Sequence, residues 1–203
     1  MAFKIASIPV LFPIDICVFS LQDSKYATTL HMKSNGARHF EVFKTNNGVY
    51  ELIADIASPN GIAMDCTDFN NKGYVAIALN YTERMQSANE GSPIYEISGR
   101  HVRAIQYFAA AHLTSMYLRN ADAEKFILLI ACTDQDIKIY NFNDWKFEES
   151  KVQFTDGALG QGGQTCVSIR KMKSYLIIAT IIWPIVRPTY ILPILNKNSM
   201  LTL

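Results

Sequence analysis

The sequence predicts an all-β protein, a partial β-propeller of about three and a half four-stranded blades. Three observations lead to this fold class. Short apolar runs recur with a period of about 50 residues, turn-forming residues separate them, and the runs are rich in β-branched and aromatic side chains. A β-sandwich with evenly spaced strands is the alternative interpretation.

One apolar run sets the register of the repeat. Its copies begin at Tyr26, Tyr74, Ile127 and Tyr175, which are 48, 53 and 48 residues apart. The copies superimpose without a gap, and each is expected to be the last strand of its repeat.

A second pair of runs predicts a hairpin at the start of each full repeat. Phe43, Tyr95 and Tyr140 each precede another apolar residue by seven positions. A turn such as Asn47-Gly48 lies between the two runs, and Asn-Gly favours a hairpin because both central residues need positive φ.

These registers divide the chain into segments. We expect residues 1–14 to be irregular, residues 15–180 to form the repeats, and residues 181–203 to be an irregular apolar tail. Within the repeats we expect a half blade at 15–31 and full blades at 40–79, 92–132 and 137–180.

The apolar C-terminal stretch is long enough to suggest a membrane span. Pro184, Pro188 and Pro193 interrupt it, and Arg187 lies near its middle, where a charge is costly in hydrocarbon. We therefore expect no membrane span.

The repeat resembles a known family. Ser92-Pro93-Ile94-Tyr95, the stretch from Gly48 to Leu52 and the ending from Gly73 to Asn80 resemble the epilepsy-associated repeat (EAR, or EPTP repeat). The resemblance covers about residues 15–180. That family includes the leucine-rich glioma-inactivated proteins and the proteins with a thrombospondin-type laminin G domain and EAR repeats.

The resemblance implies a fold and a function. Members are extracellular proteins whose seven repeats form a seven-bladed propeller that binds cell-surface or matrix partners. It therefore implies a secreted, non-catalytic protein-binding module of the adhesion or receptor-ligand type. This chain has about half the repeats of a closed ring, so open blade edges are expected to favour self-association.

Two other interpretations remain open. Residues 130–141 also resemble the end of a WD repeat, which would imply a cytoplasmic scaffold. The chain could also be a truncated propeller fragment without independent activity.

Composition and motifs argue against several other functions. Nineteen basic and eighteen acidic residues give a net charge of +1, so no basic field attracts nucleic acid. The sequence has no nucleophile elbow, phosphate loop or dinucleotide fingerprint, and its four histidines have no metal-ligand spacing. We expect no enzyme activity, catalytic residue, cofactor or metal.

The cysteines and one sequon complete the candidate sites. Cys17, Cys66 and Cys166 occupy nearly the same place in their copies. Equivalent positions on adjacent blades are not expected to meet disulfide geometry, so we expect buried free thiols. Asn80-Tyr81-Thr82 makes Asn80 a glycan acceptor if the protein is secreted. The loops at 80–92 and 133–136 are expected contact surfaces, by topology alone.

Overall fold

The computed structural model describes residues 8, 10–46, 48–80, 91–109, 113–121, 126–133, 137–143, 145–150, 164–172, 175–182 and 185–193. Within these residues the chain forms strands and no helix. The all-β fold class is confirmed. No helix in the described residues is both long and apolar enough to span a membrane.

The first sheet is an antiparallel meander. Its strands, paired in chain order, are β1 (Pro13–Leu21), β2 (Ser24–Met32), β3 (Arg38–Asn46) and β4 (Val49–Ala57). Gln22 and Gly48 adopt positive φ in the two tight turns of this sheet. The Gly48 turn lies where the Asn-Gly pair predicts it.

The second sheet repeats this arrangement. It contains β5 (Gly61–Phe69), β6 (Lys72–Leu79), β7 (Ser92–Ser98) and β8 (His101–Phe108). Asn70 and Asn71, both at positive φ, connect β5 to β6, and Gly99 at φ 61° connects β7 to β8. Asn and Gly tolerate this left-handed region, which tight hairpins require.

Two further sheets follow. The third contains β9 (Leu113–Ala121), β10 (Phe126–Thr133), β11 (Ile137–Asn143) and β12 (Lys146–Glu149). The fourth contains β13 (Gln164–Met172), β14 (Tyr175–Ile182) and β15 (Ile185–Pro193). The described residues thus form three sheets of four strands and one of three, rather than the two sheets of a sandwich.

The grouping of strands into sheets differs from the expected blades. The predicted half blade at 15–31 pairs through β2 with β3, which begins the predicted blade 40–79. The sheet boundary falls instead between β4 and β5, inside that predicted blade. A repeat period leaves the starting strand of a sheet undetermined, so every predicted blade is displaced by two strands. The segment boundaries differ as well, because β1 begins at Pro13 and β15 lies within the predicted tail.

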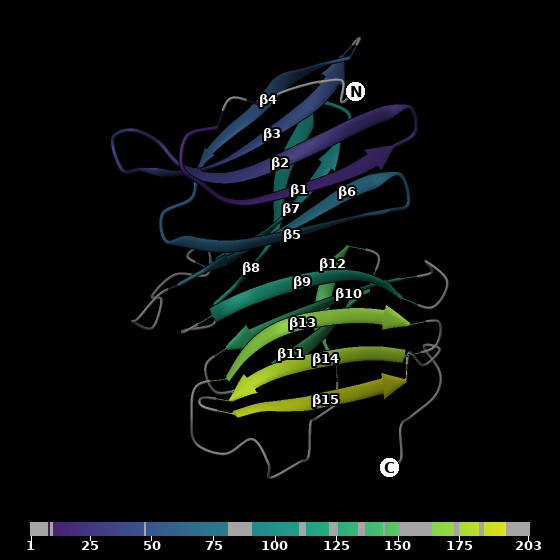
Figure 1. Cartoon of the computed structure of the whole chain (residues 1–203). Helices are drawn as coiled ribbons and strands as arrows, with labels where there is room; N and C mark the ends of the chain where they lie inside the picture. Colours follow the sequence, from purple (N-terminus) through teal and green to yellow (C-terminus); the bar gives the residue numbers. More distant parts are fainter. Residues whose placement is uncertain are drawn as a thin grey trace, which may run out of the picture.

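Consecutive sheets pack through their first strands. β1 lies against β5, β5 against β9, and β9 against β13. Figure 1 shows the first sheet at one end of the molecule and the fourth sheet at the other, so the sheets do not close on one another.

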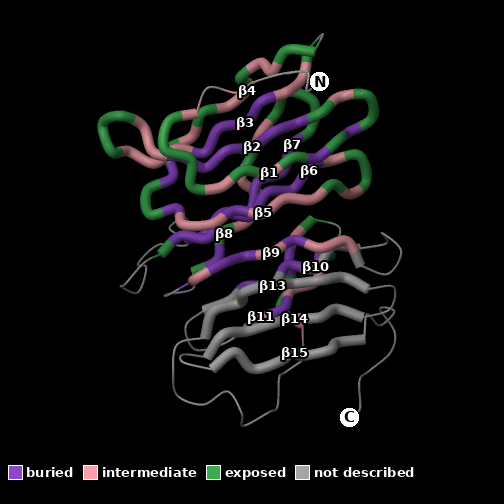
Figure 2. Tube along the Cα trace, in the orientation of Figure 1, coloured by how far each residue is buried: buried purple, intermediate pink, exposed green. Residues whose placement is uncertain are grey.

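Two apolar cores fill the spaces between the first three sheets. The core between the first and second sheets includes Phe19, Tyr26, Phe40, Val75 and Ile77. The core between the second and third includes Tyr74, Ile94, Leu118, Leu129 and Phe142. The tube in Figure 2 is accordingly buried along much of β2, β3 and β6.

Candidate functional site

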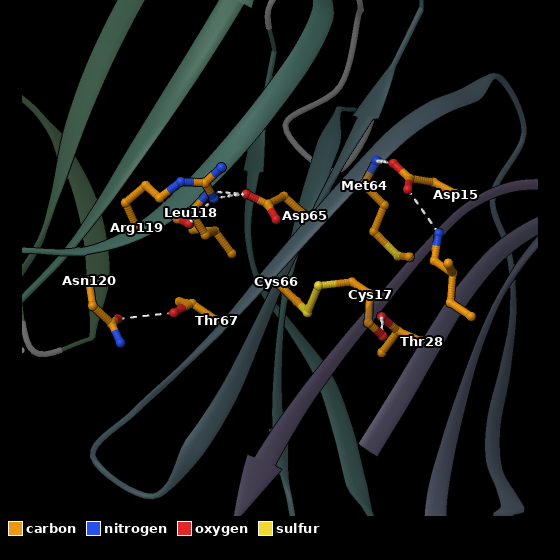
Figure 3. The surroundings of a disulfide bond; sticks show 11 residues. Asp15, Cys17, Thr28, Met64, Asp65, Cys66, Thr67, Leu118, Arg119 and Asn120 are labelled. Carbon is orange, nitrogen blue, oxygen red and sulfur yellow. Dashed lines mark hydrogen bonds and ion pairs between the residues drawn. A yellow bond between two sulfur atoms is a disulfide. The ribbon is translucent and has the colours of Figure 1, made fainter. Parts of the chain in front are cut away.

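A disulfide joins the first strands of the first two sheets. Cys17 in β1 is bonded to Cys66 in β5, with their Cα atoms 6.0 Å apart, and Figure 3 shows the bridge between the two strands. This separation lies within the usual range for a disulfide. The expectation of free thiols was therefore wrong for this pair. The side chain of Cys166 lies outside the described part of the structure.

A one-residue offset explains how the bridge forms. Cys17 pairs with Thr28, two residues beyond Tyr26, whereas Cys66 pairs with Val75, one residue beyond Tyr74. Because side chains alternate between the faces of a strand, Cys17 faces the second sheet and Cys66 faces back toward the first. Truly equivalent cysteines would both face the same way and could not meet.

This offset was visible in the sequence. Cys17 precedes Tyr26 by nine residues, and Cys66 precedes Tyr74 by eight. Since the two tyrosines are aligned, an odd difference between these spacings places the cysteines on opposite faces of their sheets.

Carboxylates next to the disulfide also connect consecutive sheets. The Met64 N–H donates to Asp15 Oδ2 at 2.9 Å, and the Leu118 N–H donates to Asp65 Oδ2 at 3.0 Å (Figure 3). Each bond runs from the first strand of one sheet to the first strand of the sheet before it. The same polar link is therefore used at both interfaces.

Asp65, one of these two linking carboxylates, has a side chain that is only 20% exposed. Burial raises the pKa of the Asp65 carboxyl above its ordinary value. The guanidinium of Arg119, which forms an ion pair with Asp65, acts in the opposite direction. Asp65 and Arg119 belong to the packed interface, and their partners give them a structural role.

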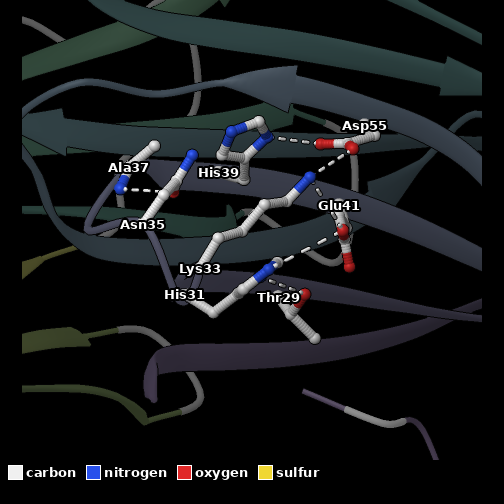
Figure 4. Close-up of polar contacts among 8 residues, drawn as sticks. All are labelled: Thr29, His31, Lys33, Asn35, Ala37, His39, Glu41 and Asp55. Carbon is white, nitrogen blue, oxygen red and sulfur yellow. Dashed lines mark hydrogen bonds and ion pairs between the residues drawn. The ribbon is translucent and has the colours of Figure 1, made fainter. Parts of the chain in front are cut away.

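The first sheet carries a polar cluster on its outer face, which is the face turned away from the second sheet. We call it the His–Asp cluster. It comprises Thr29, His31, Lys33, His39, Glu41 and Asp55 (Figure 4). Cross-strand pairing places His31 opposite His39, and Thr29 opposite Glu41, so β2 and β3 hold these groups side by side.

Close polar contacts connect the whole cluster, and Thr29 joins it through Oγ1, which lies 3.4 Å from His31 Nδ1. Lys33 Nζ lies 2.6 Å from Asp55 Oδ2 and 3.8 Å from Glu41 Oε1. His39 Nδ1 lies 2.6 Å from Asp55 Oδ1, and His31 Nε2 lies 3.7 Å from Glu41 Oε1. Lys33, Glu41 and Asp55 thus each have a partner of opposite charge, and each histidine faces a carboxylate. These contacts can orient the side chains of the cluster without a ligand.

The strand beside this cluster exposes an apolar stripe. Ile14, Ile16 and Val18 of β1 alternate with residues that face the second sheet, and Ile16 and Val18 are 60% and 66% exposed. Leu11 and Phe12 extend the exposed apolar surface. We call these five residues the β1 stripe. The alternation of apolar residues along β1 is visible in the sequence and could have predicted this stripe. Its first residues, however, fall in the segment 1–14, which was expected to be irregular.

The sequence-predicted sites lie elsewhere. Asn80 follows β6 and is exposed, and its backbone N–H donates to Asn60 O at 3.0 Å. Most of the expected contact loops, residues 81–90 and 134–136, lie outside the described residues. The structure therefore does not bring Asn80 together with another predicted site residue.

Among the described side chains, no group of three or more His, Cys, Asp or Glu residues could hold a metal ion. No protein-family model matches the chain, and no curated protein matches it either. The interpretation of this chain therefore depends on its own residues and their geometry.

Proposed function

We propose that the sheets are successive blades of a β-propeller of the epilepsy-associated repeat type. Contacts between consecutive sheets concentrate on their first strands, as they do where blades gather around a propeller axis. The chain would act as a non-catalytic module that binds another protein at the cell surface or in the extracellular matrix.

The observation that carries the extracellular part of this proposal is the Cys17–Cys66 disulfide. Disulfides persist in oxidising compartments such as the extracellular space and are rare in the cytosol. The bridge therefore favours secretion over a cytoplasmic scaffold. Exposed Asn80, at the start of a sequon, supports the same location.

Rigid sheets with surface loops support binding rather than chemistry. The strands fix the ends of each loop, so the loops can present a stable surface to a partner. The net charge of +1 offers no field for nucleic acid, which leaves protein as the preferred partner class.

The location can be tested on protein isolated from the cells that make it. Free thiols are alkylated before reduction, and peptides are then analysed by mass spectrometry. We expect a Cys17–Cys66 disulfide-linked peptide and a glycan on Asn80 that peptide N-glycosidase removes. Recovery of both cysteines alkylated before reduction, together with unmodified Asn80, would refute the extracellular assignment.

Binding needs a separate test. Purified chain carrying the disulfide is applied to unpermeabilised cells, and an equally prepared sample that has been reduced and alkylated serves as the control. We expect saturable binding by the disulfide-bonded chain only. Absence of saturable binding across a panel of cell types would instead favour a fragment without independent activity.

A further inference from the structure

The bridge between the first two sheets accounts for two of the four cysteines of this chain, Cys17 and Cys66. The other two are Cys132 in β10 and Cys166 in β13. While the first bridge is intact, each of these two can form a disulfide within the chain only with the other. The described backbone gives their register and the face of the sheet on which each lies.

Cys132 lies on the face of the third sheet that is turned away from the second sheet. Its neighbour Ala131 is buried in the core between those two sheets, as is Leu129 two residues earlier. Because successive residues of a strand alternate between its faces, Cys132 takes the opposite face. The fourth sheet packs on that side, where β13 lies against β9 and β10 (Figure 1).

The register of the fourth sheet places Cys166 on the face turned toward the third sheet. Tyr26 and Tyr74, which begin the aligned run in their sheets, are each buried in the core shared with the following sheet. The aligned Tyr175 therefore belongs on the face turned away from the third sheet. Thr180 follows five residues later on β14, an odd number, so it lies on the opposite face. Cys166 is paired with Thr180 across the sheet and shares its face.

The two cysteines also lie at the same end of their sheets. Cys132 is paired with Ser115, the third residue of β9, and Cys166 is the third residue of β13. The two carboxylate links described above join residues at nearly equal positions of consecutive first strands. Since β9 and β13 are also consecutive first strands in contact, Ser115 and Cys166 lie at about the same level.

We propose that Cys132 and Cys166 form a second disulfide, which joins the third sheet to the fourth. The arrangement repeats that of the first bridge, in which Cys17 faces the following sheet and Cys66 faces back toward the preceding one. The proposal replaces the free thiol expected at Cys166. It rests on the proposed extracellular location only for the oxidising conditions that the chain meets in cells.

Thiol–disulfide exchange with oxidised glutathione gives a balanced route to this bond. The thiolate of one cysteine attacks the glutathione disulfide, which forms a mixed disulfide and releases one glutathione. The thiolate of the other cysteine then displaces the second glutathione. The two cysteines give up two electrons and two protons, which reduce one glutathione disulfide to two glutathione thiols.

The test uses the purified full-length chain, equilibrated with a fixed ratio of oxidised to reduced glutathione. After an acid quench the remaining thiols are alkylated, and the peptides are mapped without reduction. We expect a Cys132–Cys166 linked peptide beside the Cys17–Cys66 peptide. Recovery of Cys132 and Cys166 as alkylated thiols or glutathione adducts, with Cys17–Cys66 linked, would overturn the second bridge and leave the proposed location untouched.

Two variants test whether the face of β10 decides the pairing. Cys132→Ser should lose the linked peptide and leave Cys166 open to alkylation, with the Cys17–Cys66 bond intact. Ala131→Cys combined with Cys132→Ala moves the thiol by one residue, to the face turned toward the second sheet, and should lose the link to Cys166 as well. Far-ultraviolet circular dichroism and the intact first bridge confirm that each variant is folded. A link to Cys166 that persists in the double variant would overturn the assigned faces and the proposal with them.

Discussion

Asp55 contacts the side chains of two residues of the first sheet, Lys33 and His39, at once. Its carboxylate oxygens lie 2.6 Å from Lys33 Nζ and 2.6 Å from His39 Nδ1. The hydrogen bond from Lys33, with a further one from His39, lowers the pKa of the Asp55 carboxyl below its ordinary value of 3.8. A lowered folded-state pKa means that ionised Asp55 stabilises the fold above pH 3.8 and that this contribution is lost as the pH falls through the folded pKa.

This sign gives a prediction for Asp55→Asn. Because the carboxylate is 35% exposed, solvent screens it, and we expect the variant to lower the free energy of unfolding at pH 7 by about 1 kcal/mol or less. Urea titrations from pH 7 to pH 2.5 should show this difference shrinking as the pH falls below 3.8. Asp23→Asn, at an exposed turn position, is the control. A difference that stays constant over the whole range would contradict the assigned role of the carboxylate.

At the scale of strands, Gly73 allows β6 to approach β1 closely. A Cβ atom at this position would overlap the ring of Phe19, which stacks on Tyr26 with centroids 5.2 Å apart. The Phe19 ring thus fills the space that a side chain at position 73 would need. The absence of a side chain is a packing requirement here.

We expect Gly73→Ala to lower the free energy of unfolding by roughly 1–3 kcal/mol, as overpacking of a core typically does. Phe19→Leu should restore part of that loss when it is combined with Gly73→Ala, because it removes the ring atoms that the new methyl group meets. Chemical denaturation of the two single variants and the double variant measures this coupling. Strictly additive effects would mean that the Phe19 ring does not set the spacing of the two strands.

Most strands and hairpins were predictable because local chemistry determines them, whereas β15 lies in the tail that was expected to be irregular. Asn70 and Asn71 accept positive φ, and the apolar run after them forms β6 as expected. The grouping of strands was not predictable from the same information, since neighbouring sheets are connected by only the three residues between Ala57 and Gly61. A connection this short looks like a hairpin, although here it joins two sheets.

The candidate site also has one part that the sequence could predict and one part that it could not. The His–Asp cluster is assembled from β2, β3 and β4 together with Lys33, which follows β2, and no short motif signals such a set. Cys17 and Cys66 could have been paired from their unequal spacing to Tyr26 and Tyr74. If the two positions were equivalent, both cysteines would face the same way. A bridge between sheets requires them to face in opposite directions.

For the molecule as a whole, each of the first two interfaces between sheets has two links. We call the link between the first strands of the two sheets the inner link, and the link farther from those strands the outer link. Between the first and second sheets the inner link is the disulfide. The outer link is a bidentate contact in which Arg100 donates to both carboxylate oxygens of Glu51, at 2.7 Å for each bond. Between the second and third sheets Asp65 provides the inner link. The outer link is the Gln106 amide, which donates to Phe147 O and accepts from Phe147 N–H. Of these two interfaces, within the described residues, only the first is covalent.

This asymmetry predicts how the molecule responds to loss of the disulfide. The bridge closes a separation of 49 residues, and in the chain-entropy treatment such a loop contributes about 4 kcal/mol. Sheets stacked in series contact only their neighbours, so the loss should act first on the sheet at the end of the stack.

We therefore expect Cys17→Ala combined with Cys66→Ala to accelerate amide hydrogen exchange in β1–β4 more than in β9–β11. Reductant should shift the denaturation midpoint of the wild-type chain toward that of the double variant and should leave the double variant unchanged. Phe19 and Tyr26 pack at this interface, so exchange at their amides reports directly on its opening. Equal acceleration in all the sheets would show instead that the described chain unfolds as a single cooperative unit, with the disulfide stabilising it globally.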